Sequence, residues 1–188
     1  CGFLDYNKEF IEKVLFRQTF FNCLPTNCFS FPDRNSREVS EKSKEPDFYA
    51  RTKRAELIIV ECKAIKMNGE CKDDGDYIRL LDELHEKIVF KTRNLDKNRK
   101  ACSLQPKPIG IGQLIKHIDS IEADSFEWDE NIPNDVSYYP ILVFEDVRLL
   151  QPGFLSILNR WYYEEIAKMP EMILTDMDCK PIIPVSIN

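Results

Sequence analysis

Two acidic residues and a lysine have the types and spacing that metal-assisted hydrolysis requires. Asp47 follows Pro46, and thirteen residues separate it from Glu61, which is followed by Cys62 and Lys63. Carboxylate oxygens are the ligands that hard divalent cations such as Mg²⁺ prefer. A neighbouring ammonium can stabilise the negative charge that develops on a phosphate under attack by water. We therefore expect a hydrolytic metal site if the fold brings these residues together.

The chain around these residues predicts a hairpin that ends at the charged groups. Residues 57–60 are four consecutive apolar residues, so both faces of this strand begin apolar, as in a central strand covered on both sides. The segment 47–65 is typical of two strands around a charged turn. With the turn centred on Arg54, antiparallel pairing sets Asp47 opposite Glu61, on one face, with Cβ atoms about 5 Å apart. Two carboxylates that close repel unless one is protonated or a cation lies between them.

The rest of the chain alternates between helical and extended patterns. Helices are expected over 5–21, 76–90, 111–123 and 153–168, strands over 27–31, 138–150 and 181–187, and a polar loop over 33–45. The two prolines of 181–187 favour an edge strand. This alternation predicts an α/β fold with a central mixed sheet flanked by helices on both faces. A length of 188 residues, with 43% hydrophobic content, predicts a single domain over 1–188.

The Pro-Asp and Glu-Cys-Lys constellation resembles the PD-(D/E)xK motif of the restriction-endonuclease-like nuclease superfamily. In that superfamily the aspartate opens the second core strand and the ExK closes the third, and the core order can be read along residues 5–150. The resemblance implies that Asp47 and Glu61 bind Mg²⁺, with the carbonyl of Cys62 as a further ligand. It also implies that Lys63 orients the attacking water and that Mn²⁺ substitutes for Mg²⁺.

The helix expected over 111–123 supplies two further candidates. Many superfamily members carry a glutamine in the helix after the ExK strand, and Gln113 resembles it as a catalytic residue. His117 follows four residues later, at a position where some branches have tyrosine. Gln113 and His117 share the polar face of this helix with Lys116 and Ser120, so they can face the site.

Three alternatives stay open at the level of the sequence. A glutamate of the first helix joins the metal site in some members, and Glu9 and Glu12 are equal candidates. Asp33 also follows a proline, but using it would require the polar stretch 34–45 to form a strand. The acid and lysine of the ExK motif can also form a simple salt bridge at an exposed strand end.

Charge is unevenly distributed along the chain. The net charge of −6 argues against uniform coating of nucleic acid, yet the segment 87–107 carries seven basic residues and one acid. The stretch 119–135 carries seven acids and no base. We expect the basic segment 87–107 to hold a nucleic-acid backbone, DNA in preference to RNA.

Cysteine usage and hydropathy favour a cytoplasmic protein that does not cross a membrane. Seven cysteines at irregular spacings, without a CxxC pair, favour reduced thiols over a disulfide framework or a zinc site. The longest apolar runs are too short for a membrane span. The chain starts at Cys1 rather than methionine, so we expect a piece of a longer protein, with a second copy or other domains of that protein as partners.

Two functional hypotheses follow from these features. The first, which the resemblance implies, is a Mg²⁺-dependent nuclease that hydrolyses phosphodiester bonds, as the effector domain of a bacterial restriction or anti-phage defence protein. The second is a catalytically inactive nuclease-like module that binds or scaffolds a larger assembly through the acidic stretch 119–135 or the aromatic helix at 153–168.

Overall fold

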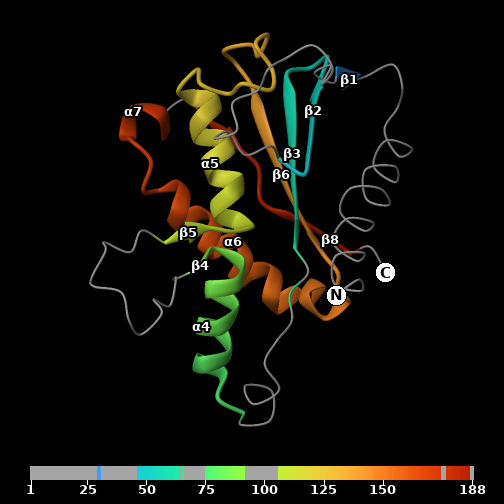
Figure 1. Cartoon of the computed structure of the whole chain (residues 1–188), viewed down its shortest axis with the longest axis vertical. Helices are drawn as coiled ribbons and strands as arrows, with labels where there is room; N and C mark the ends of the chain where they lie inside the picture. The colour runs from blue at the N-terminus through green and yellow to red at the C-terminus, as the bar shows by residue number, and fades with distance from the viewer. Residues whose placement is uncertain are drawn as a thin grey trace, which may run out of the picture.

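A mixed β-sheet built around strand β3 forms the centre of the fold (Figure 1). The computed structural model describes residues 29–30, 46–63, 65, 75–91, 106–174 and 177–186. The sheet consists of β1 (Phe29–Ser30), β2 (Phe48–Thr52), β3 (Glu56–Lys63) and β6 (Ser137–Phe144), followed by β7 (Asp178–Cys179) and β8 (Ile183–Ser186), which both pair with β6. Pairing is antiparallel from β1 to β3 and parallel from β3 onward. The predicted α/β class with a mixed central sheet is confirmed.

The β2–β3 hairpin has the register that the spacing of its charged residues predicts. Phe48 pairs with Val60, and every partner pair of the hairpin is symmetric about residue 54. Ala55 adopts a left-handed conformation, with φ of 59°, at the end of the connecting turn, which is typical of a three-residue hairpin loop. Asp47 lies one residue before β2, so it sits at the end of the hairpin opposite the turn.

The long helices follow the periodic patterns of the sequence, and one expected strand ends earlier than predicted. They are α4 (Tyr77–Ile88), α5 (Ile111–Glu122), α6 (Pro152–Ile166) and the short α7 (Glu171–Leu174), and a small ribbon joins β4 (Phe90–Lys91) to β5 (Lys107–Pro108). The strand expected over 138–150 was wrong at its end, because residues 147–150 form a 3₁₀ turn, η3 (Val147–Leu150). The carboxylate of Asp146 accepts a hydrogen bond from the backbone N–H of Arg148 (3.0 Å), and this cap starts the turn.

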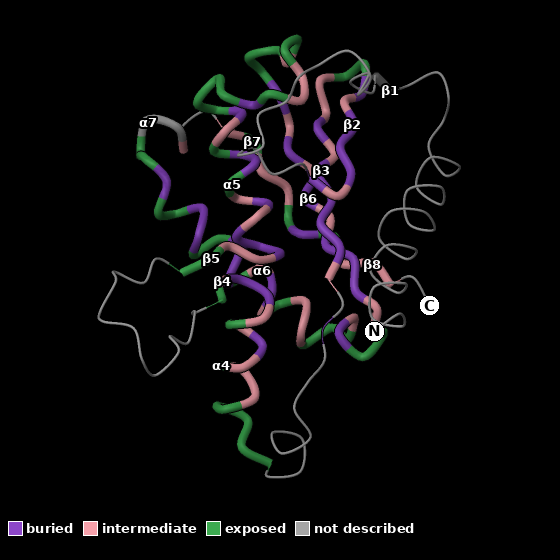
Figure 2. The backbone as a smooth tube through the Cα atoms, viewed as in Figure 1, coloured by how far each residue is buried: buried purple, intermediate pink, exposed green. Residues whose placement is uncertain are grey.

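The main core lies on the face of the sheet that α5 and α6 cover (Figure 1). Leu57 and Ile59 of β3 belong there to one apolar cluster with Leu114 and Ile118 of α5. In Figure 2 the buried backbone is concentrated in the central strands and in the turns of the helices that face them.

A smaller apolar cluster occupies the opposite face of the sheet. It contains Phe48, Ala50, Val60, Cys62 and Val143, all from strands, and no residue of a described helix belongs to it. Helices were expected on both faces. The helix predicted over 5–21, like the loop over 33–45, lies outside the described residues.

The described helices also bear on the question of a membrane span. Within the ranges that the structure describes, none combines the length and the apolar character that crossing a bilayer requires.

Candidate functional site

Glu61 lies near the carboxyl end of β3 and is completely buried, with 0% of its side chain exposed. Strand alternation places it on the same face as Ile59, toward α5. A carboxylate buried without partners would cost several kcal/mol. Glu61 has two partners. Lys63 Nζ donates to its Oε2, and His117 Nε2 lies within hydrogen-bonding distance of its Oε1, each at 3.1 Å.

The Glu61–Lys63 pair is not a salt bridge at an exposed strand end. β3 lies between β2 and β6, so it is a central strand, as its two apolar faces predict. Only 18% of the Lys63 side chain is exposed, against none of the Glu61 side chain. The simple surface pair that the sequence left open is therefore wrong.

Asp47 joins the same end of the hairpin through a backbone contact. Its Oδ2 accepts a hydrogen bond from the N–H of Cys62 at 2.7 Å. The N–H and C=O of one strand residue point toward the same neighbouring strand, so the carbonyl of Cys62 lies on the Asp47 side of β3. The thiol of Cys62 is buried in the apolar cluster on the opposite face. The three predicted metal ligands, Asp47, Glu61 and the Cys62 carbonyl, thus come from adjacent positions of one hairpin end.

The donor set of this hairpin end fits a hard divalent cation. An ionised carboxylate offers about four lone-pair positions, and the two hydrogen bonds to Glu61 use one position on each oxygen. Mg²⁺ commonly binds through one or two carboxylates and keeps several waters. Across the described ranges, no three His, Cys, Asp or Glu side chains gather closely enough to hold a metal by themselves. Glu9 and Glu12, the candidates for an additional ligand, lie outside those ranges.

Gln113 has a structural contact at the start of α5. Its side-chain oxygen accepts a hydrogen bond from the N–H of Gly110 at 3.1 Å, which is one half of a capping box. Gly110 has φ of 47°, and a Cβ there would lie 2.7 Å from the carbonyl oxygen of Ile88 and 3.4 Å from Cγ of Lys63. Gln113 therefore caps the helix beside the stem of Lys63, and a catalytic role for it stays a prediction.

His117 is the residue of α5 that reaches the buried carboxylate. The residue is 5% exposed, and the edge of its ring meets Phe126, with ring centroids 6.3 Å apart and an interplanar angle of 80°. Its spacing from Gln113 indicated the site-facing side of the helix but not the contact with Glu61. Lys116, from the same predicted polar face, is exposed, and Ser120 Oγ donates to the backbone oxygen of His117 at 2.7 Å.

Part of the predicted basic segment forms the β4–β5 ribbon. Lys91 and Lys107 are exposed and lie directly opposite each other across the ribbon. Like charges at such positions repel, so an anion bound between them would stabilise the pair. Lys87 forms an ion pair with Glu83 on α4, and residues 92–105 lie outside the described residues.

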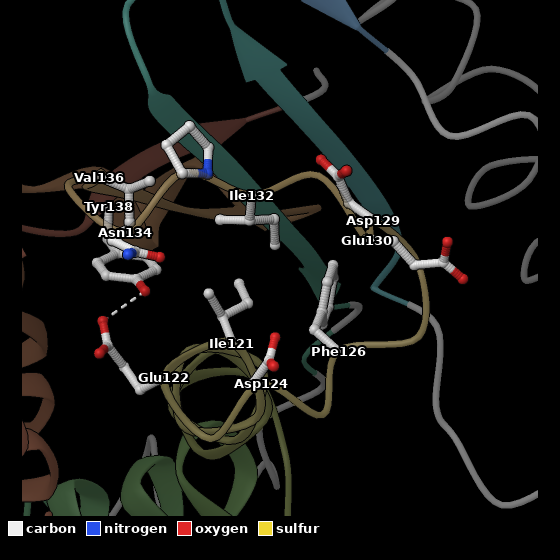
Figure 3. A pocket seen from close by; sticks show the side chains of 11 residues that line it. Ile121, Glu122, Asp124, Phe126, Asp129, Glu130, Ile132, Asn134, Val136 and Tyr138 are labelled. Atoms are coloured by element: carbon white, nitrogen blue, oxygen red, sulfur yellow. Dashed lines mark hydrogen bonds between the residues drawn. The ribbon is translucent and has the colours of Figure 1, made fainter.

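The acidic stretch 119–135 forms much of the wall of a pocket of about 380 Å³ (Figure 3). Four carboxylates line it, those of Glu122, Asp124, Asp129 and Glu130. At one end the hydroxyl of Tyr138 donates to Glu122 at 2.6 Å, the bond drawn as a dashed line in Figure 3. This pocket and the Glu61 site are separate in their lining residues.

Asp129 fastens the acidic stretch to the β2–β3 hairpin. Its Oδ2 accepts from the Tyr49 hydroxyl (3.0 Å) and from Arg51 Nε (2.7 Å), and its Oδ1 accepts from Arg51 Nη2 (3.4 Å) and from the N–H of Asn131 (3.0 Å). Burial by itself raises the pKa of Asp129, but the hydrogen bonds from Arg51, Asn131 and Tyr49 outweigh it and hold the pKa below its ordinary value. Burial, and then the charge of Asp129, raise the pKa of Tyr49, so this hydroxyl keeps its proton and remains a donor.

The sequence and the structure were compared with known proteins. No protein-family model, curated protein or solved structure matches this chain.

Proposed function

We propose that this chain is a Mg²⁺-dependent nuclease domain with a restriction-endonuclease-like fold, which hydrolyses phosphodiester bonds in nucleic acid, DNA in preference to RNA. The observation that carries the proposal is Glu61, a fully buried carboxylate at the end of a central strand, held by Lys63 and His117 beside Asp47. A buried charge is a poor source of stability, because desolvation offsets much of the attraction to its partners. Such a cluster at the end of a central strand, in which Glu61 accepts two hydrogen bonds and keeps lone pairs for a ligand, supports a functional role.

The roles of the residues follow from their positions. Asp47, Glu61 and the carbonyl of Cys62 would hold the metal ion. When bound there, the ion supplies an activated water and an electrophile for the phosphate oxygens. Lys63 is partly exposed and fixed to Glu61, so its ammonium is available to orient a water and to stabilise charge on the phosphate.

The β4–β5 ribbon supports nucleic acid as the substrate. Lys91 and Lys107 present two ammonium groups from facing positions, a geometry that suits a phosphate backbone. Each phosphate contact contributes about 0.9 to the slope of log K against log salt for double-stranded DNA. Changing both lysines to alanine is therefore expected to weaken binding and to reduce that slope by about 2. An unchanged slope would remove the ribbon from the substrate site.

The decisive experiment is cleavage of labelled DNA and RNA with Mg²⁺ or Mn²⁺ by the wild type and by Asp47→Asn, Glu61→Gln and Lys63→Met. Asp178→Asn is the matched control, because Asp178 is an exposed carboxylate hydrogen-bonded to Ser137 and Lys180, away from the hairpin end. We expect cleavage by the wild type and by the control, and loss of cleavage in the three site variants with unchanged circular dichroism. Equal activity in all five proteins would indicate a contaminant or a different catalytic centre.

A second candidate function is a binding module without turnover, favoured by the acidic pocket of about 380 Å³. Its signature would be the absence of cleavage in every protein, together with no rise in melting temperature on addition of Mg²⁺ or Mn²⁺. Binding of a lysine- and arginine-rich peptide that is lost in Glu122→Gln and Asp124→Asn would then assign the pocket.

A further inference from the structure

His117 has a role at the metal site that rests on the proposed nuclease function. His117 is well inside α5, and almost none of it is exposed. An ionised carboxylate, the form that binds a metal ion, only accepts hydrogen bonds, so in that form the contact of 3.1 Å to Glu61 Oε1 assigns the hydrogen to Nε2 of His117. The lone pair of Nε2 is therefore not available to a metal ion, and this nitrogen is not itself a ligand.

A row of aromatic side chains packs against the His117 ring. Its edge-on contact with Phe126 is followed by a tilted contact between Phe126 and Tyr49, with centroids 5.1 Å apart and an interplanar angle of 54°. Tyr49 is in turn hydrogen-bonded to Asp129. This row of side chains limits rotation of the imidazole, so the direction of its N–H is set by the fold.

The two partners of Glu61 differ in how firmly they can orient it. Lys63 reaches Oε2 through a long, partly exposed side chain with freely rotating donors. His117 reaches Oε1 from a buried ring whose position is fixed. The plane of the carboxylate, and with it the direction of the lone pairs that remain, is therefore determined mainly by His117.

We propose that His117 is a positioning residue, which orients the Glu61 carboxylate so that it and Asp47 bind one divalent cation. Groups that hydrogen-bond to metal ligands typically change metal affinity by about 10- to 100-fold when they are removed. The substitution His117→Leu, which removes the donor but keeps an apolar side chain against Phe126, is expected to weaken Mn²⁺ binding by about that factor. His117→Gln carries an N–H at a similar reach and is expected to recover most of the affinity.

The test is isothermal titration calorimetry of the full chain with Mn²⁺ alone, so that it does not depend on cleavage. His85→Leu is the matched control, because His85 is the other of the two histidines and also has an edge-on aromatic contact, with Trp161 at a centroid distance of 5.1 Å. Its affinity is expected to equal that of the wild type. Glu61→Gln is included as the variant in which binding should be lost.

The possible results separate the two proposals. Loss of affinity in His117→Leu with recovery in His117→Gln supports the positioning role. Wild-type affinity in folded His117→Leu, with binding lost in Glu61→Gln, overturns that role and leaves the nuclease proposal intact. No Mn²⁺ binding by the wild type overturns both. If circular dichroism shows that His117→Leu does not fold, His117→Asn replaces it, since its amide is too short to reach Oε1, and equal affinities of the Asn and Gln variants overturn the role.

Discussion

Two carboxylates lie over the same face of the β2–β3 hairpin, and they are satisfied to different degrees. Asp129 accepts four hydrogen bonds, two on each oxygen, which matches the number of its lone pairs. Glu61 is more deeply buried, yet it accepts two, from Lys63 and His117. A saturated carboxylate can hold parts of the fold together but has little capacity left for a ligand. The contrast indicates a structural role for Asp129 and a binding role for Glu61.

Phe126 connects these two regions. Its ring contacts both Tyr49, a partner of Asp129, and His117, a partner of Glu61. Phe126 and Asp129 belong to the same segment between α5 and β6, and both line the acidic pocket. The segment that Asp129 fastens to the hairpin therefore also carries the ring that packs against His117. The saturated carboxylate thus helps to define the surroundings of the unsaturated one.

The largest expected difference between the two carboxylates is in catalysis. Glu61→Gln removes a metal ligand and is expected to lower kcat for Mg²⁺-dependent cleavage by about 100-fold or more. Asp129→Asn, the matched isosteric change, is expected to leave kcat within a few-fold, because Asp129 does not touch the site. Initial rates on a fluorescent DNA substrate at saturating Mg²⁺ measure both. Equal losses in two folded variants would contradict the assignment of separate roles.

Stability is expected to change in the opposite order. Asp129→Asn weakens charge-assisted hydrogen bonds to Arg51 and Tyr49, so we expect a loss of about 1–2 kcal/mol in the free energy of unfolding. This corresponds to a fall of roughly 2–8 °C in Tm for a chain of this size. Glu61→Gln is expected to cost less than Asp129→Asn, because the carboxylate loses its desolvation cost and its partner Lys63 is partly exposed, so the ammonium can turn to water. Urea and thermal unfolding in the presence of a chelator measure both effects, and a larger loss in Glu61→Gln would reverse the comparison.

The hairpin shows how far the sequence determines this arrangement. The spacing from Asp47 to Glu61 and the position of the charged turn were sufficient to predict the register about residue 54, because antiparallel pairing couples each residue to one partner. The apolar residues on both faces of β3 were sufficient to predict its central place. The prolines of the last strand correctly indicated an edge, since β8 pairs only with β6 among the described strands.

Contacts between distant segments could not be predicted in the same way. The bond between His117 and Glu61 depends on how α5 is rotated against the sheet, which helical periodicity fixes only to a broad face. The Arg51–Asp129 pair joins residues 78 positions apart, in a loop with no periodic pattern. The β4–β5 ribbon has two residues in each strand, too few for alternation to be recognised.

The pH dependence of stability offers a further test of Asp129. Its pKa is lower in the folded chain than its ordinary value of 3.8, so below that pH the unfolded chain binds the proton more readily. The stability that this carboxylate contributes is present above pH 3.8 and is lost as the pH falls through the folded pKa. The difference in stability between the wild type and Asp129→Asn is therefore expected to shrink below pH 3.8. Urea midpoints measured from pH 6 downward test this, and a difference that does not depend on pH would show that the charge of Asp129 is not responsible.

The smallest expected effect comes from removing one hydroxyl. Tyr49→Phe deletes a single donor to Asp129 and is expected to cost about 1 kcal/mol. Tyr138→Phe is the control, because its acceptor, Glu122, is exposed and water can replace the hydroxyl there, so the loss should be smaller.

Double-mutant cycles apply this small change to both carboxylates. Combining Tyr49→Phe with Asp129→Asn is expected to give less than the sum of the single losses, because both changes remove the same hydrogen bond. Combining it with Glu61→Gln is expected to be additive within about 0.5 kcal/mol, since the deleted hydroxyl bonds to Asp129, whereas Glu61 accepts from Lys63 and His117. Non-additivity in the second cycle would mean that the row of aromatic contacts transmits strain from the fastening carboxylate to the candidate metal site, and that the two regions are one coupled unit.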